Sequence, residues 1–236
     1  MKTLFKLLLI SCMLCSHVYG QKSSKLFIDG NVGINSVWIT NQNAYGNMKI
    51  PYGTAFGHTV SLGIALQYEL YSLDASVGNL RLGQYYSGEQ YDGTSNWSIN
   101  LNYLQVPVLA SVKLYDDGNS IWLSAGPSFL YLLGAKQKFE RKGGDPLPNP
   151  EYFKEGKYDV KERFQKFDVG FALRIKRMYK FSSSDNMFYW AFNSYFGFLD
   201  IHAKDYRIKD YLGVYKNSHN LYFGVTVGLC INTTKK

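Results

Sequence analysis

The chain has 236 residues, a formal net charge of +8, 22 Gly and 17% aromatic residues, with Tyr alone at 20. Its length suits one large domain, and no linker divides it. Beyond residue 20 there is no run of roughly eighteen apolar residues, the length that a membrane helix needs. A chain rich in Tyr and Gly is typical of β-sheet with many turns.

The first twenty residues are predicted to be a secretory signal peptide. Lys2 and Lys6 give a basic start, an apolar run from Leu7 to Cys15 follows, and Gly20 is a small residue suited to cleavage. That apolar run is far too short to span a bilayer. We therefore expect an exported protein with a signal peptide at 1–20.

An alternative cleavage site lies inside the signal. The residues Leu-Ile-Ser-Cys at 9–12 loosely resemble a lipobox, but cleavage there would leave about half a usual apolar run. Cleavage near residue 20 is favoured, with one domain at 21–236. Cys230 is then the lone cysteine, so no intramolecular disulfide can form and the residue is expected to be a small packing residue.

Alternation of apolar and polar residues predicts eight β-strands. They lie at residues 25–35, 58–70, 73–82, 99–115, 120–133, 166–176, 187–199 and 221–232. The fifth is apolar on both faces, so its phase is not defined by the sequence. Connections after the second, fourth and sixth strands are short, and those after the first, third, fifth and seventh are long. Strands of about 10–14 residues suit a tilted membrane crossing, and this loop asymmetry is typical of outer-membrane barrels.

The strands carry charges on the polar face, which would be inside a membrane barrel and outside a soluble one. These are Asp29, Glu69, Asp74, Lys166, Asp168, Arg174 and Lys176. Aromatic residues near strand ends favour the membrane alternative, because bilayer interfaces collect them in two belts. The belt towards the short turns would contain Tyr68, Tyr71, Tyr115, Trp122, Tyr179, Phe181 and Phe188. The belt towards the long loops would contain Trp38, Phe56, Tyr85, Trp97 and Tyr131. A soluble β-barrel remains the alternative.

The fourth strand has a proline in its middle, which cannot donate to a ladder. Its apolar residues move from odd positions, such as Leu101, to even ones from Leu104 onward. The pattern predicts a β-bulge near Asn102-Tyr103 that changes the phase and leaves Pro107 facing the lumen.

Three segments carry a family resemblance: Tyr103–Pro107, Gly126-Pro127 and Tyr131-Leu132. Over residues 99–136 the chain resembles the outer-membrane β-barrel domain family common in Bacteroidota, which includes the PorT-like proteins. The resemblance implies an eight-stranded antiparallel up-and-down transmembrane β-barrel, with long extracellular loops and short periplasmic turns, in the outer membrane. Most of the family has no assigned activity, and its PorT-like members are associated with protein secretion.

Catalytic residues are not indicated by any motif. Some eight-stranded barrels are lipid A-modifying enzymes that use His with Ser and an acidic partner. His202 lies near Asp200 and Asp205, and His219 follows Ser218, while His58 stands alone. No nucleophile motif supports a site, so exposed loop histidines are the simpler interpretation and we expect no enzyme activity.

Metal and cofactor sites are not expected either. The sequence has no paired His or Cys spacing, and Asp117–Asn119 reads as a tight turn rather than a calcium loop. Eight strands leave an interior that side chains can fill, so the lumen is predicted to be plugged.

Binding is the remaining class of function. The loop at 135–163 mixes charges with Phe139, Tyr152, Phe153 and Tyr158, which suits contact with another envelope or secretion protein. The net charge falls from +8 to +6 when Lys2 and Lys6 leave with the signal, and it suits lipopolysaccharide better than nucleic acid. We expect a non-enzymatic barrel that anchors, binds or assists assembly of an envelope component. Alternatives are a PorT-like secretion accessory and a lipid A-modifying enzyme.

Overall fold

A computed structural model of the protein describes residues 24–40, 52–90, 92–144, 155–182, 184–207, 209 and 213–234. The signal peptide predicted at 1–20 and its alternative cleavage site lie outside these residues. Within the described ranges, no helix is long and apolar enough to cross a membrane.

Ten antiparallel strands make up the regular structure of the described residues. They are β1 (Lys25–Ile39), β2 (Tyr52–Gly53), β3 (Ala55–Gln67), β4 (Tyr71–Gln90), β5 (Gly93–Asp116), β6 (Asn119–Lys142), β7 (Gly156–Asp159), β8 (Phe167–Lys180), β9 (Met187–Gly197) and β10 (Asn220–Asn232). Two short 3-10 turns, Lys161–Arg163 and Lys204–Tyr206, lie in the connections.

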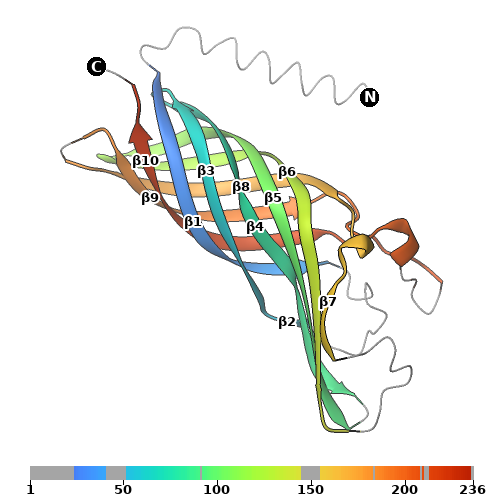
Figure 1. The fold of residues 1–236 in the computed structure, drawn as a ribbon. Coiled ribbons are helices and arrows are strands. Elements are labelled where there is room, and N and C mark those ends of the chain that lie inside the picture. The colour runs from blue at the N-terminus through green and yellow to red at the C-terminus, as the bar shows by residue number, and fades with distance from the viewer. Residues whose placement is uncertain are drawn as a thin grey trace.

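Eight of the strands close into a barrel (Figure 1). The order β4-β3-β1-β10-β9-β8-β6-β5 returns on itself because β4 also pairs with β5. The other two strands lie off this ring, β2 on β4 and β7 on β6. The prediction of an all-β, eight-stranded, antiparallel up-and-down barrel is therefore confirmed.

The barrel has its apolar side chains outside and its polar ones inside. On β1, Ile34 is 69% exposed whereas Asn31 is 6% exposed, and on β3 Leu62 is 66% exposed. Such a surface is unfavourable in water but suits hydrocarbon, which accepts apolar side chains and no unpaired backbone groups. The outward face is thus a lipid-facing belt.

Short turns at one end of the barrel match the prediction. They span residues 68–70, 117–118 and 181–186. In the tightest of them the Asp117 carboxylate accepts a hydrogen bond from the backbone N–H of Asn119, and Gly118 has φ 92°. This geometry is a turn rather than a metal loop.

The opposite end differs from the prediction, because three strands continue beyond the barrel (Figure 1). The expected long loop after the third strand is instead a tight hairpin in which Gln90 pairs with Gly93. Strand β6 runs on to Lys142, so much of the predicted loop at 135–163 is strand. Its residues 145–154, with Tyr152 and Phe153, lie outside the described ranges.

We call this extension the projecting sheet and define it as residues 79–90 of β4, 93–102 of β5 and 134–142 of β6. Its inner face is apolar, and residues such as Leu82, Ile99 and Phe139 join one buried core cluster. Val160 and Ile201, from two of the long connections, belong to the same cluster. The barrel is therefore polar inside at the level of the belt and closed by an apolar core at the end with the long connections.

The predicted phase change in β5 is wrong. Apolar residues face outward in the belt but inward in the projecting sheet, and this reversal explains the error. Odd-numbered residues are buried from residue 93 to residue 111, so Leu101 and Pro107 lie on the same inward face. Within the belt the apolar residues point outward to lipid, whereas in the projecting sheet they point inward to a core. The same reversal occurs in β4, where Val77 points outward and Leu80 points inward.

A register shift does occur at the predicted level, between Asn102 and Tyr103, but the extra residue lies in the neighbouring strand. Asn102 pairs with Gly134 and Tyr103 with Leu132, so Leu133 of β6 is the bulged residue. The phase change therefore belongs to β6 and follows Leu132. Residues 120–133 have apolar residues on both faces for another reason: the inward Trp122, Leu130 and Leu132 belong to interior clusters, and the outward residues of the same stretch face lipid.

Pro107 faces the lumen, as predicted. The pairing of β4 with β5 is interrupted between Ala75↔Val108 and Gly78↔Gln105, where Pro107 has no N–H to donate. The closed barrel absorbs the missing bond inside its wall.

The aromatic belts are partly as predicted. Phe56, Tyr71 and Tyr131 are exposed on the outer surface. The prediction is wrong for Trp97 and Trp122. They are 6% and 1% exposed and belong to the two interior clusters. Each occupies an inward position of its strand, which a count of aromatics near strand ends cannot distinguish.

Candidate functional site

The lumen is filled by a buried polar network. Lys176 Nζ lies 3.5 Å from the Oδ2 atom of Asp74. The Asp74 carboxylate also accepts hydrogen bonds from the hydroxyls of Ser72 and Ser111, and the Ser111 hydroxyl lies 2.7 Å from Ser124 Oγ. A buried ion pair requires such additional hydrogen bonds to offset the cost of removing its charges from water.

A second group of contacts surrounds Asp29. Its carboxylate accepts hydrogen bonds from the Tyr189 hydroxyl at 2.6 Å and from the Asn31 amide at 3.2 Å. The Cys230 thiol lies 3.5 Å from its other oxygen, so this cysteine is a buried member of the network. These contacts join β1 to the neighbouring strand β10 and to β9 beside it, on the inner side of the barrel wall.

The predicted inward charges divide into two sets. Asp29, Asp74, Asp168 and Lys176 are buried inside, and Arg174 is half-buried with its Nε 2.7 Å from Asn193 Oδ1. Glu69 and Lys166 are exposed instead. They lie one or more residues beyond the strand ends, in a turn and a connection, so the alternation no longer fixes their direction.

An interior cavity of about 20 Å³ lies within the network, lined by side chains that include Asn31, Gln105 and Arg174. A volume of this size holds about one water molecule. The described side chains around this cavity therefore fill this part of the lumen.

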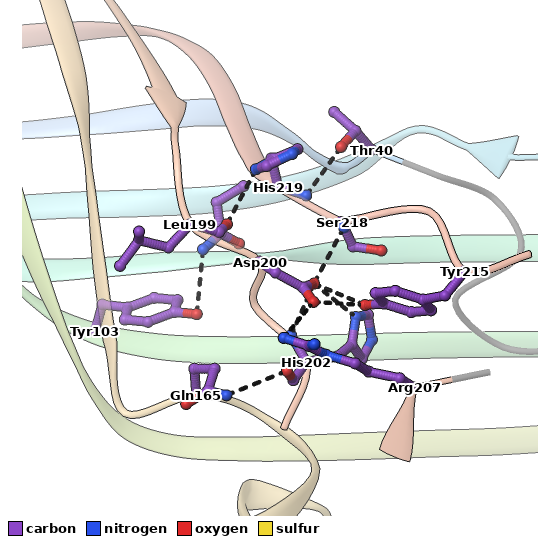
Figure 2. Close-up of polar contacts among 11 residues, drawn as sticks. Thr40, Tyr103, Gln165, Leu199, Asp200, His202, Arg207, Tyr215, Ser218 and His219 are labelled. Carbon is purple, nitrogen blue, oxygen red and sulfur yellow. Dashed lines mark hydrogen bonds and ion pairs between the residues drawn. The ribbon is translucent and has the colours of Figure 1, made fainter. Parts of the chain in front are cut away.

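At the end with the long connections, Asp200 organises the mouth of the barrel (Figure 2). Its carboxylate accepts hydrogen bonds from the Tyr215 hydroxyl at 2.7 and 2.8 Å, and Arg207 Nη2 lies 2.9 Å away. The backbone N–H groups of His202 and Ser218 donate to it at 3.3 and 3.2 Å. One carboxylate therefore holds together both ends of the connection between β9 and β10.

Backbone hydrogen bonds attach this connection to its neighbours. The Ile201 N–H donates to the Ser218 carbonyl at 2.9 Å, and the Gln165 N–H donates to the Ile201 carbonyl at 2.7 Å. Thr40 and His219 exchange two bonds of 2.9 Å, which joins the end of β1 to the start of β10. These bonds fix the two described ends of the connection at the barrel mouth.

The titrating groups at the mouth have pKa values shifted by this packing. Burial, together with the hydrogen bond to Asp200, raises the pKa of the Tyr215 hydroxyl. Burial lowers the pKa of His202 to about 4, and the nearby Arg207 lowers it further while Asp200 opposes the shift. His202 is therefore neutral at pH 7.

The structure brings only some of the candidate catalytic residues together. His202 and Ser218 both lie beside Asp200, with His202 Nδ1 3.9 Å from Asp200 Oδ1. Both are buried, at 2% and 0% exposed, and the His202 ring packs on Phe164. A nucleophile must be reachable by its substrate, so this arrangement suits a structural role better than a catalytic one.

The other candidate residues lie elsewhere. His219 Nδ1 is 3.0 Å from the Leu199 carbonyl oxygen, and its ring lies against Phe196. His58 is on the outer surface of β3, where its Nε2 is 3.2 Å from Asn79 Oδ1. Asp205 is exposed in the 3-10 turn. In the part of the chain that the structure describes, His, Cys, Asp and Glu form no group of three or more that could hold a metal ion.

Sequence reasoning missed the central role of Asp200. Its partners Arg207 and Tyr215 lie in an irregular connection with no periodic pattern, and only the short spacing to His202 drew attention to the segment. It also missed the projecting sheet, which could have been detected from the reversal of apolar residues at the same point in two neighbouring strands.

Comparison with known protein families agrees with this architecture. The model of a family described as an outer membrane protein beta-barrel domain matches residues 19–203. No curated protein matches the chain. Among solved structures, the chain is similar to the outer membrane protein OprG from Pseudomonas aeruginosa, with 10% identity, a TM-score of 0.46 and coverage of 92% of this chain and 99% of that one.

Two further structures show a comparable degree of similarity. A major outer membrane protein from Thermus thermophilus has 10% identity and a TM-score of 0.47, covering 89% of this chain and 100% of that one. Neisserial surface protein A has 10% identity and a TM-score of 0.43, covering 88% of this chain and 98% of that one.

Proposed function

Because the chain belongs to the outer membrane protein β-barrel domain family, we propose that it is a non-enzymatic barrel that anchors an extracellular binding platform in the outer membrane. In barrels of this kind short turns face the periplasm and long connections face the exterior. The projecting sheet is then extracellular, and its tip carries the binding surface.

One observation supports this proposal above the others: β4, β5 and β6 leave the membrane as continuous strands, and their inner face belongs to an apolar core that they share with the barrel mouth. Strands are stiffer than loops, so recognition groups at the tip are held in place by the barrel below. The filled lumen supports anchoring rather than transport, and the buried positions of His202 and Ser218 support a structural rather than enzymatic role.

The partner is proposed to be another envelope protein. Strand β7 lies on the outer edge of β6, and its residues Lys157, Tyr158 and Asp159 are all exposed. Exposed aromatic and charged groups beside one another are typical of the rim of a protein interface. This retains the predicted contact through 135–163 in its described part.

The test shortens the platform and leaves the barrel intact. Ser87 and Asn96 face each other across the hairpin, so residues 88–95 can be replaced by Asn-Gly, which favours a two-residue turn. The matched control, Asp117→Asn, places Asn-Gly in the turn at the opposite end. Both chains carry a photo-crosslinking residue at Tyr158 and are expressed in the native cell.

We expect both variants to fractionate with the outer membrane and to show heat-shifted gel mobility. The control should crosslink an envelope protein and the shortened chain should not. A crosslink of equal yield in the shortened chain would rule out the platform as the binding surface.

The sequence resemblance also implies a second role for the same surface, that of a PorT-like accessory protein of secretion in Bacteroidota. We keep it as an alternative. It rests on residues 99–136, which form most of β5 and β6. If the crosslinked protein is a secretion component, and secretion stops when the platform is shortened, the PorT-like role is supported.

The lipid A-modifying alternative has a separate test. Intact-mass analysis of lipid A from cells with and without the gene would reveal a change in acyl chains or phosphates. Identical lipid A masses remove this alternative.

A further inference from the structure

The outward face of the projecting sheet changes its chemistry at one level. Below that level, Val77 of β4 and Leu104 of β5 are exposed apolar residues of the belt. Asn79 and Arg81 follow on β4, and Asn102 follows on β5. Asn79 pairs with Leu104 and Arg81 pairs with Asn102, so the change occurs over two neighbouring rows of the two strands. A surface at this height lies beside lipid headgroups.

The asparagines and Arg81 are held in place by hydrogen bonds along this face. Asn79 Nδ2 donates to Asn102 Oδ1 at 2.8 Å. Arg81 donates from Nε and Nη2 to Asn100 Oδ1, at 3.1 and 2.6 Å. A guanidinium has more N–H groups than these two bonds use, and the asparagine oxygens are already engaged. The face therefore presents ordered donors.

The charges on this face change with distance from the membrane, from basic residues nearest to it to a mixture of acidic and basic residues farther away. Asn100 pairs with Lys136 and Ser98 with Lys138, so two lysines lie in the rows next above Arg81. One carboxylate accompanies them, because Asp159 of β7 pairs with Lys136. The rows farther from the membrane contain Glu140, which forms an ion pair with Lys138, and Glu89, together with Lys142.

We propose that this face binds the phosphorylated sugar headgroup of an outer-leaflet glycolipid. Arg81 and Lys136 contact the phosphate, and the side-chain amides of Asn100 and Asn102 donate to sugar hydroxyls. The acyl chains continue down the belt over Val77, Leu104 and Leu133. The positive charges lie nearest the membrane, where the phosphate of such a lipid would be, and the acidic residues mostly lie beyond it.

This site requires the barrel to be in the outer membrane but does not depend on the protein-binding platform. It uses Arg81, Asn100 and Asn102 on the outward face of β4 and β5, with Lys136 of β6, whereas the protein contact is proposed at the hairpin of residues 88–95 and on the neighbouring strand β7. Loss of one function with retention of the other would therefore distinguish the two proposals.

The test measures lipid binding to the full-length protein in nonionic detergent. The probes are diphosphorylated lipid A and the same lipid A with its phosphates removed. The test variant is Arg81→Gln/Lys136→Gln. The matched control is Lys142→Gln/Lys209→Gln, which removes the same charge from exposed positions at the far end of the sheet and in the connection between β9 and β10. Heat-shifted gel mobility confirms folding, and Lys136→Gln alone serves if the double variant does not fold.

We expect the dissociation constant for diphosphorylated lipid A to rise about tenfold or more in the test variant, since each basic residue near an anionic surface adds to binding. The control should stay within about twofold of the parent, and dephosphorylated lipid A should bind all chains equally weakly. Equal losses in test and control variants would mean that only net charge matters and would overturn the proposal. Tight binding of the dephosphorylated lipid would overturn it as well.

Discussion

Asp200 holds the single hydroxyl of Tyr215 between both of its carboxylate oxygens, at 2.7 and 2.8 Å. The two residues lie near opposite ends of the connection between β9 and β10, so their contact joins those ends. We call the described residues of this connection, 198–207 and 213–219, the cover. The carboxylate is buried with these partners, and an amide in its place has one acceptor oxygen instead of two and no charge to pair with Arg207.

The substitution Asp200→Asn should therefore loosen the cover more than it affects the barrel. Loss of a buried hydrogen-bonding charge costs about 1–3 kcal/mol, and Tyr215→Phe, which removes one donor, about 1 kcal/mol. Hydrogen exchange of residues 198–219 in detergent measures the opening. Exchange rates that match the parent in both variants would show that the cluster does not hold the connection.

The stability of the same cover should depend on pH because of His202. Burial holds its folded pKa near 4, below the unfolded value of 6.5. Between those values the unfolded chain binds more protons than the folded one, so stability is complete above pH 6.5 and is lost as pH falls towards 4. The loss is at most about 3 kcal/mol. Hydrogen exchange across this range should show increasing opening in the parent and a flatter profile in His202→Leu. Identical profiles would contradict the assignment.

The ion pair inside the lumen gives a prediction for the barrel itself. Lys176→Met leaves the Asp74 carboxylate buried without its cation and should destabilise the fold by about 3–5 kcal/mol. The double variant Lys176→Met/Asp74→Asn removes both charges and should recover much of that loss. Urea unfolding in detergent micelles measures both. If the single and double variants unfold at the same urea concentration, the two residues are not coupled.

The filled lumen predicts the absence of a general pore. Purified protein in planar bilayers should show no stable, large conductance, because the interior cavity of about 20 Å³ is about the size of one water molecule. The variant Arg174→Ala shortens a side chain that lines the cavity, so it should enlarge the cavity and serves as a comparison. A steady open channel in the parent would contradict the packing described.

The sequence defined the barrel well because the alternation within the belt is uniform. On β8, Phe171 and Ile175 alternate with Ala172 and Lys176 without interruption, and the structure has the same phase. The projecting sheet could not be read in the same way. In β4 and β5 the apolar residues change sides without any change in backbone phase, so Leu101 and Leu104 gave the impression of a bulge in β5.

The mouth of the barrel was less accessible to prediction for a different reason. Asp200 and Tyr215 are joined through an irregular segment, and irregular segments have no periodicity from which to infer contacts. The bulged residue Leu133 was also hidden, since an extra residue in an apolar strand is visible only once its partner strand is known.

The outward face of β5 passes from lipid to water between Val106 and Asn102, and both the barrel and the projecting sheet depend on this boundary. Single spin labels at Thr94, Ser98, Asn102, Val106 and Ala110, in a Cys230→Ser background and in bilayers, measure it directly. Accessibility to a water-soluble paramagnetic reagent should be high at residues 94–102 and low at 106 and 110, with oxygen accessibility showing the opposite trend. Uniform access to the water-soluble reagent along the whole strand would contradict a membrane barrel with a projecting extracellular sheet.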